Sequence, residues 1–240
     1  MQLKETINWV VITVLATVIS CTKSPERDEA ITGNIIKPVE RTDTTEEYLI
    51  DTLNSFVTWI GTKPTGRHNG VFRLREGALY LMNDTLVYGK ITIDMSTVDI
   101  LDLKDNPVLY NKLLAHIKSK DLLDIKNYPS AEFELVKIET HKEEIKKSKG
   151  TYYSIADPNF MVTGNLTMCD STLSVSFPAR INVINNKLEG MARFNLDRTD
   201  WGIDYMNEND PVARAKDSYF HNKVNIGLTI IARNKSHNIF

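Results

Sequence analysis

The sequence predicts a mainly β domain in which about eight antiparallel strands share one buried face. Three observations support this prediction. Apolar and polar residues alternate with a period of two over most of the chain after Tyr48, and this period is typical of half-buried strands. Most segments between the alternating runs are short, as they are between consecutive antiparallel strands. Only the segment around residues 107–124 has the period of a helix.

The clearest strands are two adjacent runs in the second half of the chain. Every odd position over residues 173–183 is apolar, and every even position over residues 188–196 is apolar or glycine. The pair Asn185-Asn186 between them is a candidate two-residue hairpin turn. Further strands are predicted over residues 56–61, 70–74, 77–81, 87–95, 131–138, 160–168 and 224–230. Closing the sheet into a barrel would remove its edges, but periodicity alone does not separate a barrel from a sandwich.

The segment around residues 107–124 is expected to form a short helical insert that covers one end of the sheet. Pro107 suits a first helical turn, and either Asp105 or Asn106 is suited to cap it. Residues 141–150, which are dense in lysine and glutamate, are expected to form an exposed hairpin tip. Four apolar residues recur at spacings of four, one and three and so share one helix face: Leu109, Leu113, Leu114 and Ile117.

The N-terminus has the pattern of an export signal. Lys4 precedes an apolar run over residues 7–19, which is too short and too interrupted to span a bilayer comfortably. The run ends in Val-Ile-Ser-Cys, which resembles a bacterial lipobox, so residues 1–20 are expected to be a signal peptide and Cys21 to carry a lipid anchor. The alternatives are an ordinary signal peptide or an uncleaved anchor, with Cys21 incidental.

The same pattern divides the chain and gives an expected location. Residues 21–47 are rich in charged residues, threonine and proline and are expected to be a flexible tether. Residues 48–232 are the predicted barrel domain, and residues 233–240 are a C-terminal tail. A lipid-anchored protein of this kind is expected in the bacterial cell envelope, in the periplasm or at the outer membrane.

Composition and spacing exclude several classes of function. The formal net charge of −2 gives no electrostatic case for nucleic-acid binding. If Cys21 is acylated, Cys169 has no disulfide partner, and no basic neighbour in sequence activates its thiol. The five histidines do not lie at metal-ligand spacing, so no metal site is predicted. Residues 61–66 match only the first part of a phosphate-binding loop and precede a strand pattern, and no nucleophile turn is present. Enzymatic activity therefore has no positive support.

An ordered set of motifs runs over roughly residues 48–232. Its most specific part is Lys-Asp-Leu-Leu-Asp at 120–124 followed by Tyr-Pro-Ser-Ala-Glu-Phe at 128–133. The other motifs are Val-Thr-Trp-Ile-Gly at 57–61, Gly-Arg-His-Asn-Gly at 66–70, Gly-Lys-Ile-Thr-Ile-Asp-Met at 89–95, Val-Thr-Gly-Asn-Leu-Thr at 162–167 and Arg-Thr-Asp-Trp-Gly-Ile at 198–203. In this order the set resembles the YceI-like family. Cys169-Asp170 departs from the family at a position where glycine is usual, and the tail after residue 203 is longer.

The resemblance implies an eight-stranded antiparallel lipocalin-like β-barrel that holds a polyisoprenoid lipid or an isoprenoid quinone as its ligand, without a cofactor. A homodimer is also compatible with the resemblance. His68, Arg198 and Asp200 lie in resembling loops and are expected either to contact the ligand head group or to fix the loops, Arg198 and Asp200 as a local ion pair. The inward residues expected to line the lumen are Ile91, Ile93, Val175, Phe177, Phe194 and Ile226.

Two other functions stay open at this point. The apolar stripes could fill the lumen completely, which would favour a structural or partner-binding envelope protein. An enzyme acting on a lipid or a hydroxylated aromatic would need at least two titratable groups that converge inside the lumen. The strands that can be read from sequence place almost none there.

Overall fold

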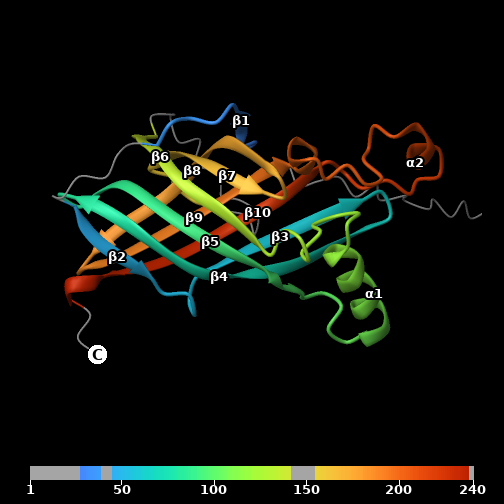
Figure 1. Ribbon diagram of the computed structural model, residues 1–240, viewed down its shortest axis with the longest axis horizontal. Helices are drawn as coiled ribbons and strands as arrows, with labels where there is room; N and C mark the ends of the chain where they lie inside the picture. The colour runs from blue at the N-terminus through green and yellow to red at the C-terminus, as the bar shows by residue number, and fades with distance from the viewer. Residues whose placement is uncertain (1–27, 39–44, 142–154, 238–240) are drawn as a thin grey trace, which may run out of the picture.

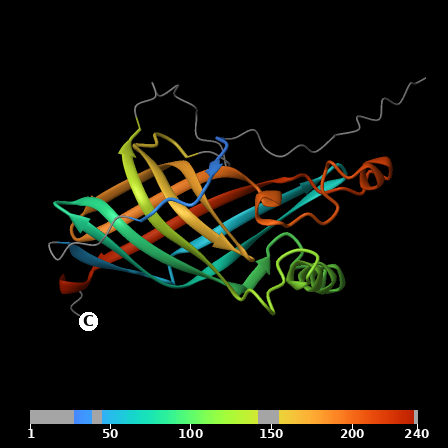
Figure 2. The ribbon, with the colours of Figure 1, turned by 45° about the horizontal axis from the view of Figure 1, so that its top comes forward.

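The computed structural model describes residues 28–38, 45–141 and 155–237, and the strands of this part form one antiparallel barrel (Figures 1 and 2). The helical elements are α1 (Pro107–Lys118), α2 (Pro211–Ala215) and the single 3-10 turns η1 (Arg198–Trp201) and η2 (Lys235–His237). The strands are β1 (Ile31–Gly33), β2 (Glu46–Ile50), β3 (Phe56–Lys63), β4 (Gly66–Met82), β5 (Thr85–Ile100), β6 (Ser130–Thr140), β7 (Phe160–Met168), β8 (Ser171–Ile184), β9 (Lys187–Asp197) and β10 (Lys223–Asn234).

The barrel closes because β3 pairs with β4 on one side and with β10 on the other. From β4 to β10, each strand pairs with its neighbours in the chain. β2 lies between β4 and β10 as well and continues the line of β3, so these two strands share one of eight positions around the barrel. The predicted eight-stranded antiparallel barrel with a short helical insert is therefore confirmed.

β4 is one strand where the sequence predicts two, over residues 70–74 and 77–81. Its pairing with β5 shifts register between Val71 and Arg73 and again between Leu74 and Glu76. Phe72 and Leu74 are buried at even positions before the second shift, and the next buried leucine, Leu79, is at an odd position after it. A bulge adds one residue and exchanges the two faces of a strand. Because the buried positions change from even to odd numbers, the sequence pattern resembles two separate strands, although pairing with β5 continues.

Residues 28–38, here called the seam segment, lie against the barrel wall (Figure 2). β8 and β9 pair directly from their shared turn as far as Ala179 and Ala192. Farther from that turn, β8 pairs with β1 instead, through residues 174–176. On the other side, Asn195 of β9 exchanges backbone hydrogen bonds with Asp28 and Ala30, each of 2.9 Å. This part of the expected tether is therefore paired with the barrel, although most of its residues are exposed, because it supplies backbone partners that β8 and β9 do not supply to each other. Residues 21–27 and 39–44 of the tether lie outside the described residues.

The helical insert is confirmed, but it is shorter than expected. α1 ends at Lys118, and residues 119–128 continue as turns. Of the two candidate caps the structure uses Asn106, whose side-chain oxygen accepts a hydrogen bond of 3.1 Å from the Leu109 amide. Among the described residues, no helix has the length and hydropathy needed to cross a bilayer. Residues 142–154, which include most of the expected hairpin tip, lie outside the description.

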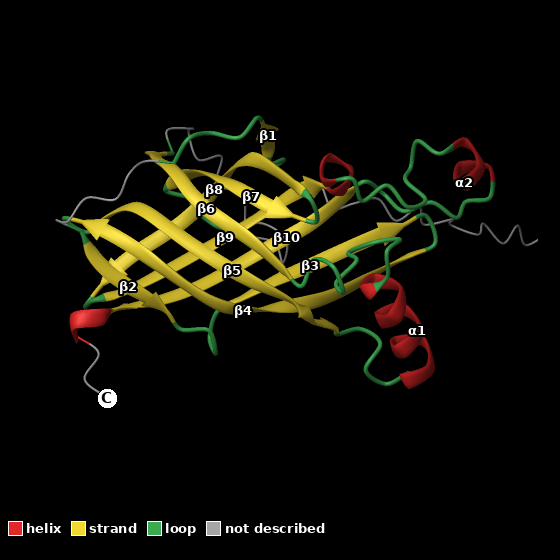
Figure 3. Cartoon of the chain, in the orientation of Figure 1, coloured by secondary structure: helices red, strands yellow, loops and turns green. Residues whose placement is uncertain are grey.

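The two ends of the barrel differ in construction (Figure 3). The hairpin end carries the β4–β5 and β8–β9 turns. Asn185 and Asn186 have φ values of 52° and 61°, which confirms the predicted two-residue turn, and Asn83 and Asp84 adopt the same left-handed region. The helical end carries α1, α2 and the tip of the β3–β4 hairpin. The candidate site reaches the surface at this end.

Candidate functional site

The barrel lumen contains three apolar cavities in a row. The helical-end cavity has a volume of about 200 Å³, the middle cavity about 110 Å³ and the hairpin-end cavity about 80 Å³. Neighbouring cavities share parts of their walls: Met95 and Ile226 line the first two, and Phe133 and Phe177 line the last two. The lumen is thus an interrupted tunnel, and side chains do not fill it completely.

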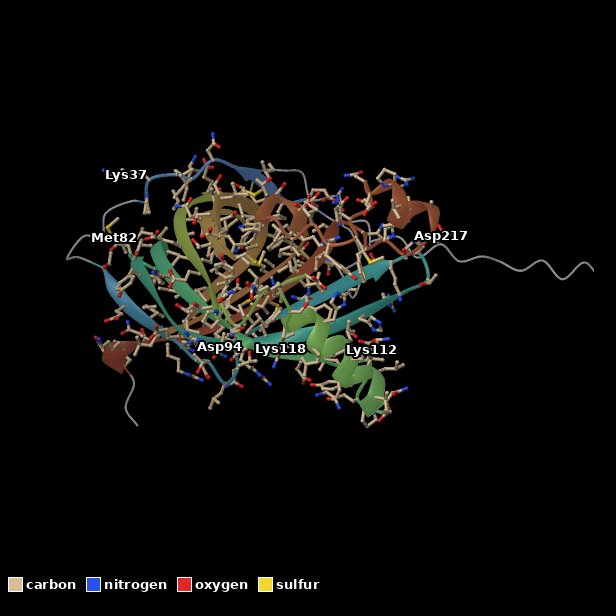
Figure 4. The ribbon with its side chains drawn as sticks, turned by 45° about the vertical axis from the view of Figure 1, so that its right-hand side comes forward. Lys37, Met82, Asp94, Lys112, Lys118 and Asp217 are labelled. Atoms are coloured by element: carbon tan, nitrogen blue, oxygen red, sulfur yellow. The ribbon has the colours of Figure 1, made fainter. Side chains whose placement is uncertain are left out.

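The helical-end cavity is apolar inside and charged at its rim. Leu113 and Ile117 of α1 face it together, because residues four apart lie on one side of a helix. Arg67, at the tip of the β3–β4 hairpin, lines the cavity and is exposed, so the cavity reaches the surface there. Lys112 and Lys118 of α1 lie at this end of the molecule, whereas Met82 lies at the hairpin end (Figure 4). A ligand chain therefore has its open entrance beside α1.

The middle cavity contains all six residues that the sequence predicts as lumen lining. They come from strands on opposite sides of the barrel and point inward from the alternating positions that the sequence shows. Their contact with a ligand stays a prediction. The six residues in its wall are Ile91, Ile93, Val175, Phe177, Phe194 and Ile226.

A cluster of three phenylalanines lies between the middle cavity and the hairpin-end cavity. The rings of Phe177 and Phe194 are stacked, with centroids 4.3 Å apart and planes 15° apart. The ring of Phe133 lies 5.7 Å from that of Phe177. Sequence analysis did not single out Phe133 as lining, although its place in the Ala131–Ile138 run allowed either face.

His68 lines the helical-end cavity but already has a partner at the rim. Its Nδ1 lies 2.8 Å from a carboxylate oxygen of Asp102, and the other oxygen accepts a hydrogen bond from the Asn69 amide. The pair ties the β3–β4 tip to the segment that follows β5. Of the two expected roles of His68, the contact that the structure shows is the one that fixes the loop.

Arg198 organises the loops of the helical end. Its guanidinium is buried and donates hydrogen bonds to the backbone oxygens of Ile203, Tyr205, Phe220 and His221. Burial lowers the pKa of Arg198 from its usual range, against the opposing effect of nearby carboxylates. The donors are thus used to hold the loop of residues 203–221 over the end of the barrel.

The expected local ion pair between Arg198 and Asp200 is not what the structure shows. Asp200 instead accepts a hydrogen bond of 2.9 Å from the hydroxyl of Thr32, in the seam segment. The correction has a simple cause, because η1 turns the two side chains to different sides: Arg198 is buried under the loop, while Asp200 is exposed. Asp200 therefore contributes to the seam, and the structure does not place it in a cavity wall.

His221 and Glu208 form a second rim pair that the sequence does not reveal. His221 Nδ1 lies 3.0 Å from a Glu208 carboxylate oxygen, and His221 lines the helical-end cavity. The two residues are separated by a loop with no alternation or motif, so no sequence signal connects them. Together with the pair of His68 and Asp102, they place polar groups around an apolar entrance.

The described residues give no support for a metal or thiol site. No group of three or more histidine, cysteine, aspartate or glutamate side chains in this part of the chain could hold a metal ion. Burial, followed by the charge of Asp124, raises the pKa of the Cys169 thiol, which disfavours the reactive thiolate. Cys21, the expected lipidation site, lies outside the described residues.

Comparison with known proteins gives the family. The model of the YceI-like domain matches residues 48–232. The chain belongs to the YceI-like family. No curated protein matches the chain.

Solved structures support the fold of this YceI-like barrel. Burkholderia cenocepacia BcnA is 17% identical, with a TM-score of 0.55, over 76% of this chain and 98% of BcnA. A polyisoprenoid-binding domain from Saccharophagus degradans, implicated in plant cell wall breakdown, is 11% identical, with a TM-score of 0.50, over 78% of this chain and 98% of that domain.

Proposed function

We propose that this YceI-like protein holds the chain of a polyisoprenoid lipid or isoprenoid quinone in its lumen, and carries or sequesters it at a membrane. The observation that carries the proposal is the row of apolar cavities that reaches the surface beside α1. The Saccharophagus degradans neighbour, described as a polyisoprenoid-binding domain, supports the same ligand class.

The physical basis is the transfer of an apolar chain out of water. Each buried methylene contributes about 0.8 kcal/mol, and part of that gain is offset by the ordering of the chain. An eight-stranded barrel has an interior wide enough for one small ligand. The gain needs no directed hydrogen bond, so the middle and hairpin-end cavities, whose walls carry no polar side chain, suit a prenyl chain better than a polar substrate.

A binding role is favoured over catalysis by the chemistry of the cavity walls. General acid–base or nucleophilic catalysis needs a positioned proton donor, acceptor or nucleophile. None of the three cavities is lined by an aspartate, glutamate, serine or cysteine among the described residues. The polar residues that line the helical-end cavity are Thr62, Lys63, Arg67, His68, Arg198 and His221. Among them, His68, Arg198 and His221 have polar contacts with the loops around the cavity.

We also propose that the protein is exported and anchored to the cell envelope through a lipid on Cys21. The support is the sequence of residues 1–21. An isoprenoid chain is nearly insoluble in water, so a carrier held at a membrane exchanges its ligand without a long aqueous path. Dimerisation stays a prediction.

Native mass spectrometry of the full chain, expressed in a bacterial host and extracted in mild detergent, tests these proposals together. We expect an adduct with a stoichiometry of one, which organic extraction identifies as a prenyl lipid or quinone. We also expect the loss of residues 1–20 and a gain of lipid mass, both abolished in Cys21→Ser.

An apo mass that does not change after incubation with long isoprenoids would contradict the carrier proposal and favour a partner-binding barrel. A chain that keeps residues 1–20 and gains no lipid would contradict the anchor alone. The oligomeric mass in the same spectra tests the homodimer.

A further inference from the structure

Phe133, Phe177 and Phe194, here called the aromatic layer, divide the lumen. Phe133 on β6 and Phe177 on β8 line both the middle cavity and the hairpin-end cavity, whereas Phe194 on β9 lines only the middle one. The layer therefore forms the aromatic side of the boundary between these cavities, from β6 across β8 to β9, and Ile91 of β5 with Leu228 and Ile230 of β10 forms the other side. A chain that enters beside α1 meets this layer after the first two cavities.

The layer is held firmly in place. Phe177 and Phe194 are 3% and 4% exposed, and their rings are stacked. The ring of Phe133 lies directly on the backbone of β7 at Gly164, where an added Cβ would be 2.3 Å from it. Burial and stacking therefore confine Phe177 and Phe194, and the backbone of β7 limits the movement of the Phe133 ring.

The space above the layer is small for a long prenyl chain. The helical-end and middle cavities have volumes of about 200 Å³ and 110 Å³. Sites that enclose a drug-sized ligand typically have roughly 300–1,000 Å³. The hairpin-end cavity, of about 80 Å³, lies beyond the layer.

We propose that the aromatic layer is the floor of the binding site and sets how many isoprene units the barrel buries. The inference rests on the proposed function and adds selection by chain length, with Phe177 as the main determinant because it contacts both other rings. Each isoprene unit above the floor gains affinity by burial. Units beyond the floor's limit stay outside and add nothing.

Binding of a graded series of prenols to the full chain tests the proposal. Geraniol, farnesol, geranylgeraniol and longer all-trans prenols share one head group and differ only in length. Dissociation constants are measured by tryptophan fluorescence, since Trp59 lines the helical-end cavity. In the wild type we expect affinity to rise about tenfold or more with each buried unit and then to level off at a definite length.

Phe177→Ala should open the floor. We expect the levelling-off point to move to a longer prenol by one unit or more, with an affinity gain of about tenfold for that prenol and little change for geraniol. Gly190 lines the hairpin-end cavity, and an added Cβ there would lie 3.6 Å from its nearest neighbour. Gly190→Val in the Phe177→Ala chain should therefore fill the opened space and restore the original limit. Phe177→Leu, which removes the ring but keeps most of the bulk, provides a milder variant if Phe177→Ala does not fold.

The outcomes separate the two levels of inference. A wild-type affinity that keeps rising with length, or a limit unchanged in Phe177→Ala and Phe177→Leu, overturns the aromatic floor while the carrier role stands. Failure of every prenol to bind the wild type overturns the proposed function, and the floor with it.

Discussion

At the hairpin end the β4–β5 and β8–β9 turns reverse the chain within two residues, as at Asn185-Asn186, whereas at the helical end two segments leave the barrel, over residues 101–129 and 198–222. The short turns depend on the backbone preference of the residues that form them. The long excursions depend on contacts between residues far apart, such as those that Arg198 makes with the 203–221 loop. Local backbone preference therefore governs these short turns, and long-range contacts govern the two long excursions beside the entrance.

Removing the centre of the long-range network should give the largest effect. Arg198→Met keeps most of the side-chain volume but leaves several loop carbonyls without their donor, and we expect a loss of about 3 kcal/mol in the free energy of unfolding. Arg198→Lys should not rescue it, because a single ammonium does not reproduce the planar guanidinium. Urea denaturation measures the loss, and hydrogen exchange should show it concentrated in residues 203–221.

Arg75→Met is the matched control. Arg75 is 44% exposed and reaches Asp94 at 3.5 Å, so its removal should change stability by no more than about 0.5 kcal/mol. Equal losses in the two variants would contradict the special role of Arg198.

The hairpin end should respond to backbone preference instead. Asn186 has a φ of 61°, and Asn186→Ala should cost about 1 kcal/mol because alanine is strained in the left-handed region. Asn186→Gly should be neutral or nearly so. Both are measured by the urea midpoint, with prenol affinity unchanged. A glycine variant as destabilised as the alanine variant would show that side-chain contacts, not φ, hold this turn.

The same difference explains what the sequence could predict. The β8 and β9 runs and their turn were readable because alternation and asparagine are local signals. The inward direction of the six predicted lining residues followed from the alternation, while the expectation of a cavity came from the family resemblance; all six lie in the wall of the middle cavity. These features needed no knowledge of distant partners.

The errors arose where distant partners decide the structure. The seam segment lacks a strand period because its bonds come from elsewhere: the side chain of Asn165 both accepts from the Ile36 amide and donates to the Ile36 carbonyl. The pair of His221 and Glu208 joins a loop with no motif. The sequence predicts two strands in place of β4 because the extra residue between Leu74 and Glu76 reverses the alternation.

The smallest expected effect concerns the link between β5 and α1. Asp99 is partly buried, which by itself raises its pKa, but hydrogen bonds from Lys104 at 2.6 Å and Tyr110 at 2.7 Å outweigh burial and hold the pKa below its usual range. The folded pKa is thus below the unfolded one, so this stabilisation is present above about pH 4 and is lost as pH falls through the folded value.

Asp99→Asn should therefore be less stable than the wild type at pH 7, and this difference in stability should become smaller below about pH 4. Tyr110→Phe should be intermediate because it removes one of the two donors. Thermal unfolding of the three chains between pH 7 and pH 3 measures the difference. If the difference stays constant down to pH 3, the pKa of Asp99 does not change on folding. The attachment of α1 beside the entrance would then rest on the packing of Leu113 and Ile117 against the barrel rather than on this charge.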